Sequence, residues 1–315
     1  MGLLARLLAV GCVVTAMGTG CVVEKDEGDR FREAVPQAED VALRVPGSDG
    51  TAKTSQGLHV ATNGSPSNTA RYYRFSRDMT TIVDVGTAVI LGGIWAIVHS
   101  PPTTIEAKRA VWGPGQGNAL DPAVYQFTVT EVGDAEYDYV LEGRPKAGGA
   151  FIAVLRGHGY GKSRSEHRMG WFSWDNDAYR TLDPDRAHDT GSTKVSFDLR
   201  NLPAKIDVEL RPDPSQGFAN VGVTHEAQGA GSVEITALGD IDDSKTTKLE
   251  NVHVLSRWQS SGAGRADLEM KDGDLPFTVD ATECWSTSFA RVFYKDTVDF
   301  EPASGDATAC SIAAP

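Results

Sequence analysis

The chain lacks the sequence signatures of several large catalytic and nucleic-acid-binding classes. It has no HExxH, no CxxC, no GxSxG and no SxxK motif, and zinc proteases, dithiol redox proteins and many serine hydrolases depend on those spacings. It also has no cluster of Lys and Arg, and its net charge of −13 repels phosphate backbones. We therefore expect no nucleic-acid partner, no bound metal and no other cofactor.

Hydrophobic runs long enough to cross a membrane are also missing. The run nearest the N-terminus extends from Leu7 to Gly20, follows Arg6 and precedes Cys21. A positive residue, an apolar core of about ten residues and small residues before a cut are the parts of a secretory signal peptide. The run falls short of the about 20 residues that span a bilayer, which favours a cleaved signal over residues 1–20 above a retained membrane helix.

The cysteine after this run indicates a lipid anchor. Gly20 followed by Cys21 resembles the end of a bacterial lipoprotein signal, in which the Cys begins the mature chain and carries the lipid. The resemblance implies attachment to a membrane surface, and the absence of Asp directly after the Cys implies the outer membrane. Cleavage before Cys12 would leave too short a leader, whereas secretory cleavage without a lipid stays open.

Processing would leave an acidic chain with a polar beginning. Loss of the single charge of Arg6 changes the net charge from −13 to −13 − 1 = −14. The next segment is rich in Glu, Asp, Gly, Ser and Pro, and Phe31 is its one aromatic residue. Such a composition buries too little apolar surface to fold alone, so we predict a flexible, lipid-anchored tether over residues 21–68.

One stretch, from Thr69 to His99, has helical periodicity. Pro101-Pro102 ends it. The apolar and small residues that recur at steps of three and four predict a helix with one core-facing stripe, packed on a sheet or plugging its end: Tyr72, Phe75, Met79, Ile82, Val83, Gly86, Val89, Ile90, Gly93 and Ile97. Because residues 85–98 carry no charge, membrane association stays an alternative, as does a strand pair that turns at Gly92-Gly93.

After Pro102 the pattern changes to a period of two, with turn residues every eight to twelve positions. The segment from Lys205 to Arg211 alternates strictly between charged and aliphatic residues, which predicts a strand with one wet face and one dry face. Short links favour antiparallel hairpins. We predict a single mainly-β domain over residues 69–315, an antiparallel meander that forms a barrel or a strongly bent sheet. A two-sheet sandwich and an outer-membrane barrel are the alternatives.

Two cysteines remain once the leader and the anchor are set aside. Cys284 and Cys310 form an even pair in a chain expected outside the cytoplasm, where thiols oxidise. We therefore predict a disulfide between them.

An aromatic cluster is the candidate ligand surface. Trp171, Trp174 and Tyr179 lie among polar residues that include Asp175. Rings can stack on sugar faces while carboxylates accept hydrogen bonds from hydroxyls. The same rings can equally fill a core, so the cluster predicts either a glycan-binding surface or ordinary packing.

The C-terminal third adds a second resemblance. The segments from Ser256 to Asp267 and from Glu283 to Phe289 resemble uncharacterised lipoproteins of bacteria with large genomes, a group without an assigned activity. We expect a non-catalytic cell-envelope lipoprotein, anchored to the membrane by its lipid, that binds an apolar or glycan ligand or a protein partner. The alternative is an extracytoplasmic hydrolase of cell-wall or polysaccharide substrates. An enclosed apolar cavity would favour ligand carriage, and a filled interior would favour interaction at the surface.

Overall fold

The structure is a computed structural model that describes residues 28–46, 69–116, 120–161, 169–185, 189–213, 217–240 and 247–315. Its helices are α1 (Asp29–Glu33), α2 (Arg71–Val98) and α3 (Asn176–Leu182), with short 3₁₀ turns η1 (Ala38–Asp40), η3 (Ala227–Gly229) and η4 (Ala307–Ala309). The strands are β1 (Thr104–Glu106), β2 (Arg109–Gly115), β3 (Ala123–Gly133), β4 (Glu136–Pro145), β5 (Ile152–Tyr160), β6 (Met169–Asp175), β7 (Ser192–Asp198), β8 (Ala204–Arg211), β9 (Phe218–His225), β10 (Gly231–Gly239), β11 (Glu250–Trp258), β12 (Gly264–Asp272), β13 (Val279–Trp285), β14 (Arg291–Asp296) and β15 (Ser304–Gly305).

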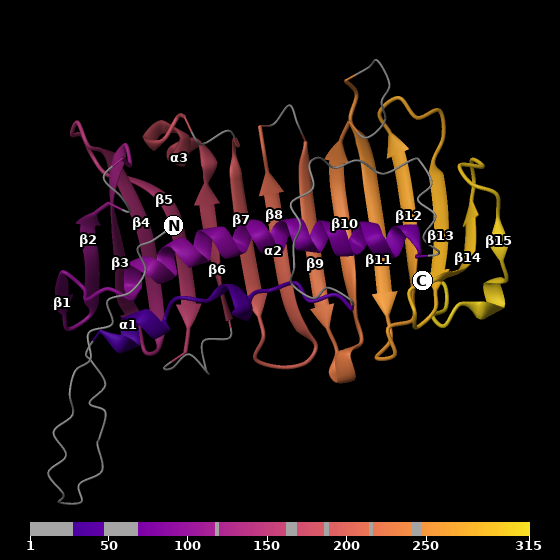
Figure 1. Cartoon of the computed structure of the whole chain (residues 1–315), viewed down its shortest axis with the longest axis horizontal. Coiled ribbons are helices and arrows are strands. Elements are labelled where there is room, and N and C mark those ends of the chain that lie inside the picture. The colour runs from indigo at the N-terminus through magenta and orange to yellow at the C-terminus, as the bar shows by residue number, and fades with distance from the viewer. Residues whose placement is uncertain are drawn as a thin grey trace, which may run out of the picture.

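The strands form one antiparallel meander in which each pairs with its neighbours in the chain, from β1 to β15 (Figure 1). The sheet is strongly bent but does not close, so the prediction of a mainly-β meander is confirmed in its bent-sheet form, and the two-sheet sandwich is wrong. The two edge strands have only three and two residues. Short edges offer little backbone for pairing with another chain.

The sheet has one dry face and one wet face. In β8 the side chains of Ile206 and Val208 are buried, whereas Lys205 and Asp207 are exposed, as the charge alternation predicts. Cross-strand pairing places Val195, Val221, Ile235 and Val254 in one row with Val208, which extends the apolar layer across the sheet. The dry face is therefore continuous and needs a cover along its whole width.

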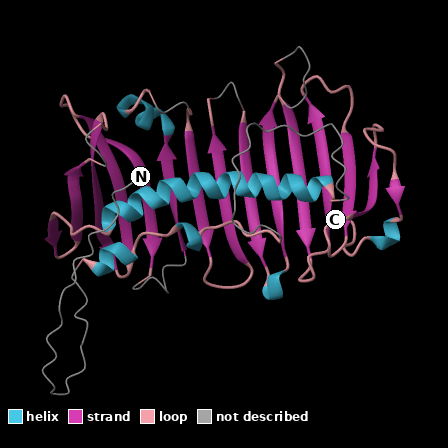
Figure 2. Ribbon diagram, viewed as in Figure 1, coloured by secondary structure: helices cyan, strands magenta, loops and turns pink. Residues whose placement is uncertain are grey.

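Helix α2 supplies most of this cover. It runs across the strands and contacts β13, β12, β11 and β3 (Figure 2). Its 28 residues make it about 42 Å long. The predicted helix near residues 69–99 is confirmed, and no turn interrupts it at Gly92-Gly93.

The N-terminal half of α2 is fixed by a buried carboxylate. Ala70, the N-cap residue, provides no side-chain cap. Instead Glu283, which is fully buried on β13, accepts hydrogen bonds from the backbone N–H of Arg71 (2.9 Å) and of Tyr72. Arg291 donates to the same carboxylate at 2.6 Å. A negative charge at a helix N-terminus is favoured by the helix dipole and satisfies the free N–H groups.

The C-terminal half of α2 buries a different face from the predicted one. Its buried residues are Thr87, Leu91, Ile94 and Val98. The predicted stripe is right for Tyr72, Met79 and Val83, but Ile82, Gly86, Val89 and Gly93 are exposed to solvent. The reason is that residues 85–98 are apolar all round, so the sequence contains no polar side to mark the outward face.

A second segment, residues 28–46, covers the dry face beside α2. It runs below the helix across several strands (Figure 1). Phe31 and Leu43 are fully buried in the same core as the helix, and the Leu43 N–H donates to Asp84 Oδ1 at 2.6 Å. The predicted tether of residues 21–68 therefore has a folded part. A few well-spaced apolar residues are enough to hold it in place, because the apolar face of the sheet buries them. Cys21 and residues 47–68 lie outside the described residues.

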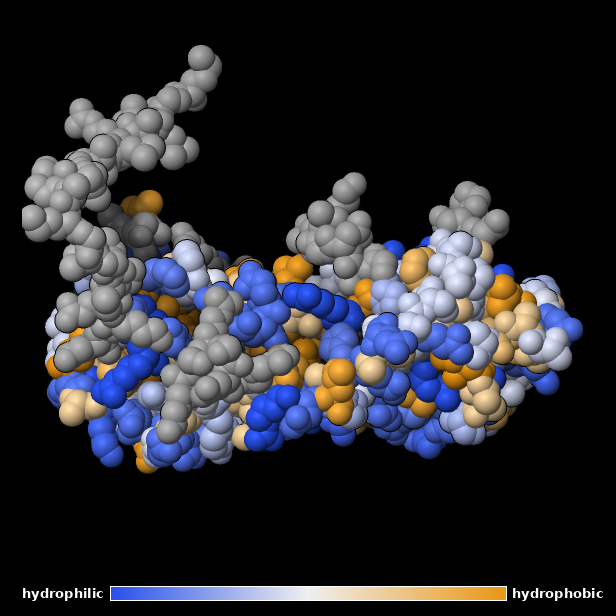
Figure 3. Space-filling view, turned by 90° about the horizontal axis from the view of Figure 1, so that it is seen from below, coloured by the Kyte–Doolittle hydropathy of each residue, from blue (hydrophilic) through white to orange (hydrophobic). Residues whose placement is uncertain are grey.

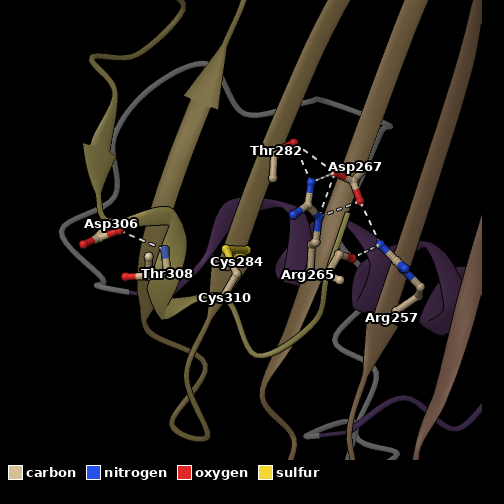
Figure 4. Close-up of a disulfide and its surroundings, with 9 residues drawn as sticks. Arg257, Arg265, Asp267, Thr282, Cys284, Asp306, Thr308 and Cys310 are labelled. Atoms are coloured by element: carbon tan, nitrogen blue, oxygen red, sulfur yellow. Dashed lines mark hydrogen bonds and ion pairs between the residues drawn. A yellow bond between two sulfur atoms is a disulfide. The ribbon is translucent and has the colours of Figure 1, made fainter. Parts of the chain in front are cut away.

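The C-terminal tail is attached to the wet face. Cys284 on β13 and Cys310 form the predicted disulfide, with a Cα–Cα distance of 5.4 Å (Figure 4). Beyond it, Arg257 donates to the backbone oxygen of Ala313 at 3.0 Å. Arg257 also pairs with Asp267 at 3.1 Å. Burial raises the pKa of the Asp267 carboxyl, but hydrogen bonds from Arg265 and Thr282 and the charges of Arg265 and Arg257 bring this pKa below its usual value.

Candidate functional site

The predicted aromatic cluster does not form one surface. Trp171 and Trp174 are three residues apart on β6, so they point to opposite faces of the sheet. Trp171 lies on the wet face, with Lys194 Nζ 5.7 Å from its ring centre. Trp174 lies on the dry side, where it packs against the core and against Tyr179, with ring centres 5.1 Å apart.

The remaining member of the cluster has a local structural role. Asp175 is the N-cap of α3, and its side chain accepts from the Ala178 N–H at 2.8 Å. An N-cap carboxylate of this kind stabilises the first turn of a helix. The two tryptophans, Asp175 and Tyr179 therefore provide no shared platform on which a sugar ring could stack.

A histidine cluster on the wet face also has a structural arrangement. His158 Nδ1 lies 2.6 Å from Asp138 Oδ1, and Nε2 lies 3.3 Å from Glu136 Oε1. Both ring nitrogens thus face carboxylates of the neighbouring strand, and the Tyr160 ring packs edge-on against the imidazole. Nδ1 is engaged by Asp138, and Nε2 is buried and makes no hydrogen bond within the described residues, so neither nitrogen is open to a substrate.

The space between α2 and the sheet is filled. The gap bounded by Tyr73, Ser76, Ser256 and Trp285 is too small for a water molecule, and Ser76 and Ser256 close it with a hydroxyl contact of 2.6 Å. At this point, where α2 meets the sheet, the described residues therefore enclose no space for a ligand. A filled interior is the feature expected of a protein that interacts at its surface, and an enclosed cavity the feature of one that carries a ligand inside its fold. The packing under α2 favours interaction at the surface.

A large groove opens instead along one end of the sheet. It has a volume of about 1170 Å³ and runs between residues 39–46 and the turns that connect alternate strand pairs. Figure 3 looks at this end of the molecule and shows hydrophobic residues among hydrophilic ones. The larger apolar residues of the lining come from four separate segments and are Val45, Pro46, Leu199, Leu202, Ile206, Trp258 and Phe289.

Two basic side chains line the same groove. Arg44 is exposed, and its guanidinium makes no hydrogen bond or ion pair with any described residue. His225 stands at the end of β9, where burial, and then the positive charge of Arg44, lowers the pKa of its imidazole. At neutral pH the imidazole is therefore neutral, and Arg44 supplies the positive charge.

Polar groups at the groove are mostly engaged in holding its walls. Trp258 Nε1 donates to the backbone oxygen of Gly229 at 3.1 Å, and Asp40 accepts from the Gln37 N–H at 2.9 Å. Ser260 and Ser261 line the groove, but no hydrogen bond joins either hydroxyl to the His225 ring among the described residues. The lining therefore suits binding better than nucleophilic catalysis, which needs a nucleophile within reach of a base.

Sequence reasoning did not find this groove. Its lining residues are distant in sequence and lie in turns, where hydrophobic periodicity carries no signal. The available hint was the pair Leu199 and Leu202, two large apolar residues in a hairpin link that would otherwise be polar; Leu202 is 62% exposed.

Neither a metal-binding cluster nor a similarity to a known protein indicates what the groove binds. Within the described ranges, no group of three or more His, Cys, Asp or Glu side chains is arranged to hold a metal ion. Comparison of the chain with protein-family models, with curated proteins and with solved structures finds no match.

Proposed function

We propose that this protein is a lipid-anchored component of the bacterial cell envelope that binds an amphiphilic ligand, an apolar chain with an anionic group, in the groove at the end of the sheet. The role is non-catalytic. The attachment is by acylated Cys21, and the membrane is the outer membrane.

Export is supported by two independent features. The N-terminal sequence has a positive residue, an apolar core and a cysteine in the order of a lipoprotein signal. The disulfide between Cys284 and Cys310 is of the kind that persists in oxidising compartments and is rare in the cytosol.

The class of ligand is supported by the lining of the groove. Its apolar side chains favour a hydrocarbon body, because burial of apolar surface is the main source of affinity for such ligands. The one observation that carries the proposal is Arg44: in a strongly acidic protein, this guanidinium lines the groove without a hydrogen-bonded carboxylate partner among the described residues, and its charge acts on Asp84 only at longer range. An anionic head group would supply that partner.

The test is binding of a fluorescent fatty acid to the full chain. Arg44→Gln is expected to weaken binding about tenfold through loss of one charge-assisted hydrogen bond. Leu202→Ser is expected to weaken binding about three- to tenfold through loss of apolar contact. Neither substitution touches the core, since Arg44 and Leu202 are exposed.

Matched controls lie at the opposite end of the sheet. Arg180→Gln removes an exposed arginine on α3, and Phe277→Ser removes a side chain that is 58% exposed between β12 and β13. Both variants should bind like the unaltered protein. Equal affinity in all five proteins, or no binding at all, would reject the groove as the site.

The hydrolase alternative has one supporting observation. His225, Ser260 and the carboxylates of Glu39 and Asp40 line the same groove, and a His with a lowered pKa is neutral and able to act as a base at pH 7. Hydrolysis of a nitrophenyl ester or of a polysaccharide that is abolished in His225→Gln would favour this alternative over binding alone.

A further inference from the structure

The C-terminal half of α2 presents an apolar face to solvent. Val89 and Trp95 are 72% and 47% exposed, and Ile82, just before this half, is 50% exposed. The small residues Gly86, Gly93 and Ala96 lie on the same face as Ile82 and Val89, at steps of three and four. No residue from 85 to 98 is charged. An exposed helix face of this composition is unusual on a soluble surface and marks an interaction site.

The chain enters the described body beside this face. Arg32 Nε donates to the backbone oxygen of Val98, the last residue of α2, at 2.7 Å. A Cβ atom on Gly28 would lie 3.5 Å from Pro102, just beyond the helix. Figure 1 shows α1 next to this end of α2, on the same face of the sheet.

The length of the connecting chain limits how far this face can be from the anchor. Seven residue steps separate Cys21 from Gly28, and seven residues span at most about 25 Å even when fully extended. A lipid on Cys21 would therefore hold the C-terminal end of α2 within about 25 Å of the bilayer surface.

We propose that the outer face of the C-terminal half of α2 lies on the lipid bilayer that holds the anchor. This inference rests on the proposed acylation of Cys21. The helix lies in the membrane plane with Val89 and its neighbours in contact with acyl chains. Trp95, whose ring packs against His99 with ring centres 3.7 Å apart, lies at the interface. Tryptophan favours that depth because its ring is apolar while its N–H stays hydrated.

The helix cannot cross the bilayer in this structure. Its composition and length are those of a membrane span, but Leu91, Ile94 and Val98 are packed on the sheet. Crossing would place the polar sheet in hydrocarbon. A single exposed face is the geometry of an interfacial helix, which buries only its apolar side.

The test follows the environment of position 89 in the acylated full chain. A nitrobenzoxadiazole label on Val89→Cys is added to phosphatidylcholine vesicles, which are neutral and do not repel this acidic protein. We expect the label emission to rise at least about twofold as the probe enters the apolar region. A label on Glu234→Cys, which is exposed on the wet face of β10, should not respond.

A second variant keeps the proposal open to rejection. Val89→Asp removes no buried contact, so it should fold normally, yet it should weaken the vesicle binding of the non-acylated Cys21→Ser chain about tenfold. A label at position 89 that stays in water on vesicle-bound, acylated protein would overturn the proposal while leaving the anchor intact. A label already shielded without vesicles would also overturn it, with a second copy as the occupant if the shielding depends on protein concentration.

Intact mass separates this test from the test of the anchor. A membrane-fraction protein without a fatty acid would contradict the proposed acylation. The Cys21→Ser chain would then still report whether the helix face binds lipid by itself.

Discussion

The two halves of α2 are held in place mainly by different kinds of interaction. Residues 71–84 are fixed by a buried carboxylate at the helix N-terminus and by an aromatic cluster in which Tyr73 stacks on Phe289, with ring centres 4.4 Å apart. Residues 85–98 are held by an apolar stripe and, at their last residue, by the hydrogen bond from Arg32 Nε to the Val98 backbone oxygen. Several directional contacts fix the position of the first half, whereas the apolar outer face of the second half is exposed to solvent.

The largest expected effect on stability is at the N-terminus of α2, where the buried carboxylate lies. Glu283→Gln should lower the free energy of unfolding by about 3 kcal/mol, because it removes a buried negative charge that pairs with Arg291 and the helix N-terminus. Urea unfolding measures the change. Glu269→Gln is the matched control: it breaks an exposed pair with Lys271 and should cost less than about 0.5 kcal/mol. Similar losses in both variants would contradict the anchoring role.

The next effect compares the two faces of the second half. Leu91→Ala should cost about 2 to 4 kcal/mol, since Leu91 is 1% exposed and its truncation leaves a cavity against the sheet. Val89→Ala, two residues away and 72% exposed, should change stability by less than about 0.5 kcal/mol. The reverse order would mean that the helix packs with the face predicted from the sequence.

Asp84, at the junction of the two halves, should make stability depend on pH. Burial raises the pKa of its carboxyl to about 6, against the opposing effects of the Leu43 N–H and the charge of Arg44. A raised folded-state pKa means that the folded protein binds more protons than the unfolded chain between pH 4 and 6. The Asp84 contribution to the free energy of unfolding therefore falls as pH rises through that window and is constant above it.

Asp84→Asn should remove this dependence, because Asn keeps an acceptor for the Leu43 N–H without a charge. Relative to the unaltered protein, the variant should gain about 1 to 2 kcal/mol between pH 4.5 and pH 7.5, after allowance for partial exposure. Urea unfolding at both pH values measures the gain. Parallel pH profiles for the two proteins would show that the carboxyl is solvated.

The smallest effect concerns backbone entropy in the second half. A Cβ on Gly93 would meet no atom within 4 Å, so Gly93→Ala should stabilise the helix by about 0.5 to 1 kcal/mol. Thermal unfolding in the absence of lipid is the measurement. Destabilisation would mean that another segment of the chain already contacts this face.

Much of the architecture could be predicted from the sequence. Strict alternation, as in Lys205 to Arg211, marks strands reliably because one face is wet, and a lone pair of cysteines leaves one choice of partner. The face of α2 could not be read over residues 85–98, which have no polar side. The folded role of residues 28–46 was hidden because Phe31 and Leu43 gain their burial from a distant sheet.

The candidate sites differ in how much could be foreseen. The separation of Trp171 from Trp174 was available from spacing alone, since residues three apart on a strand face opposite ways. The groove was not available, because Arg44, Leu202 and His225 meet only when the chain turns bring their segments to one end of the sheet.

Export is the claim on which both the ligand and the membrane-bound helix depend. Intact-mass analysis of the protein from the membrane fraction, without reducing agent, tests it most directly. The account predicts a chain that begins at Cys21, carries fatty acids and contains a bond between Cys284 and Cys310. An intact chain that begins at Met1 in the cytosol, with free thiols at both positions and no lipid, would contradict it.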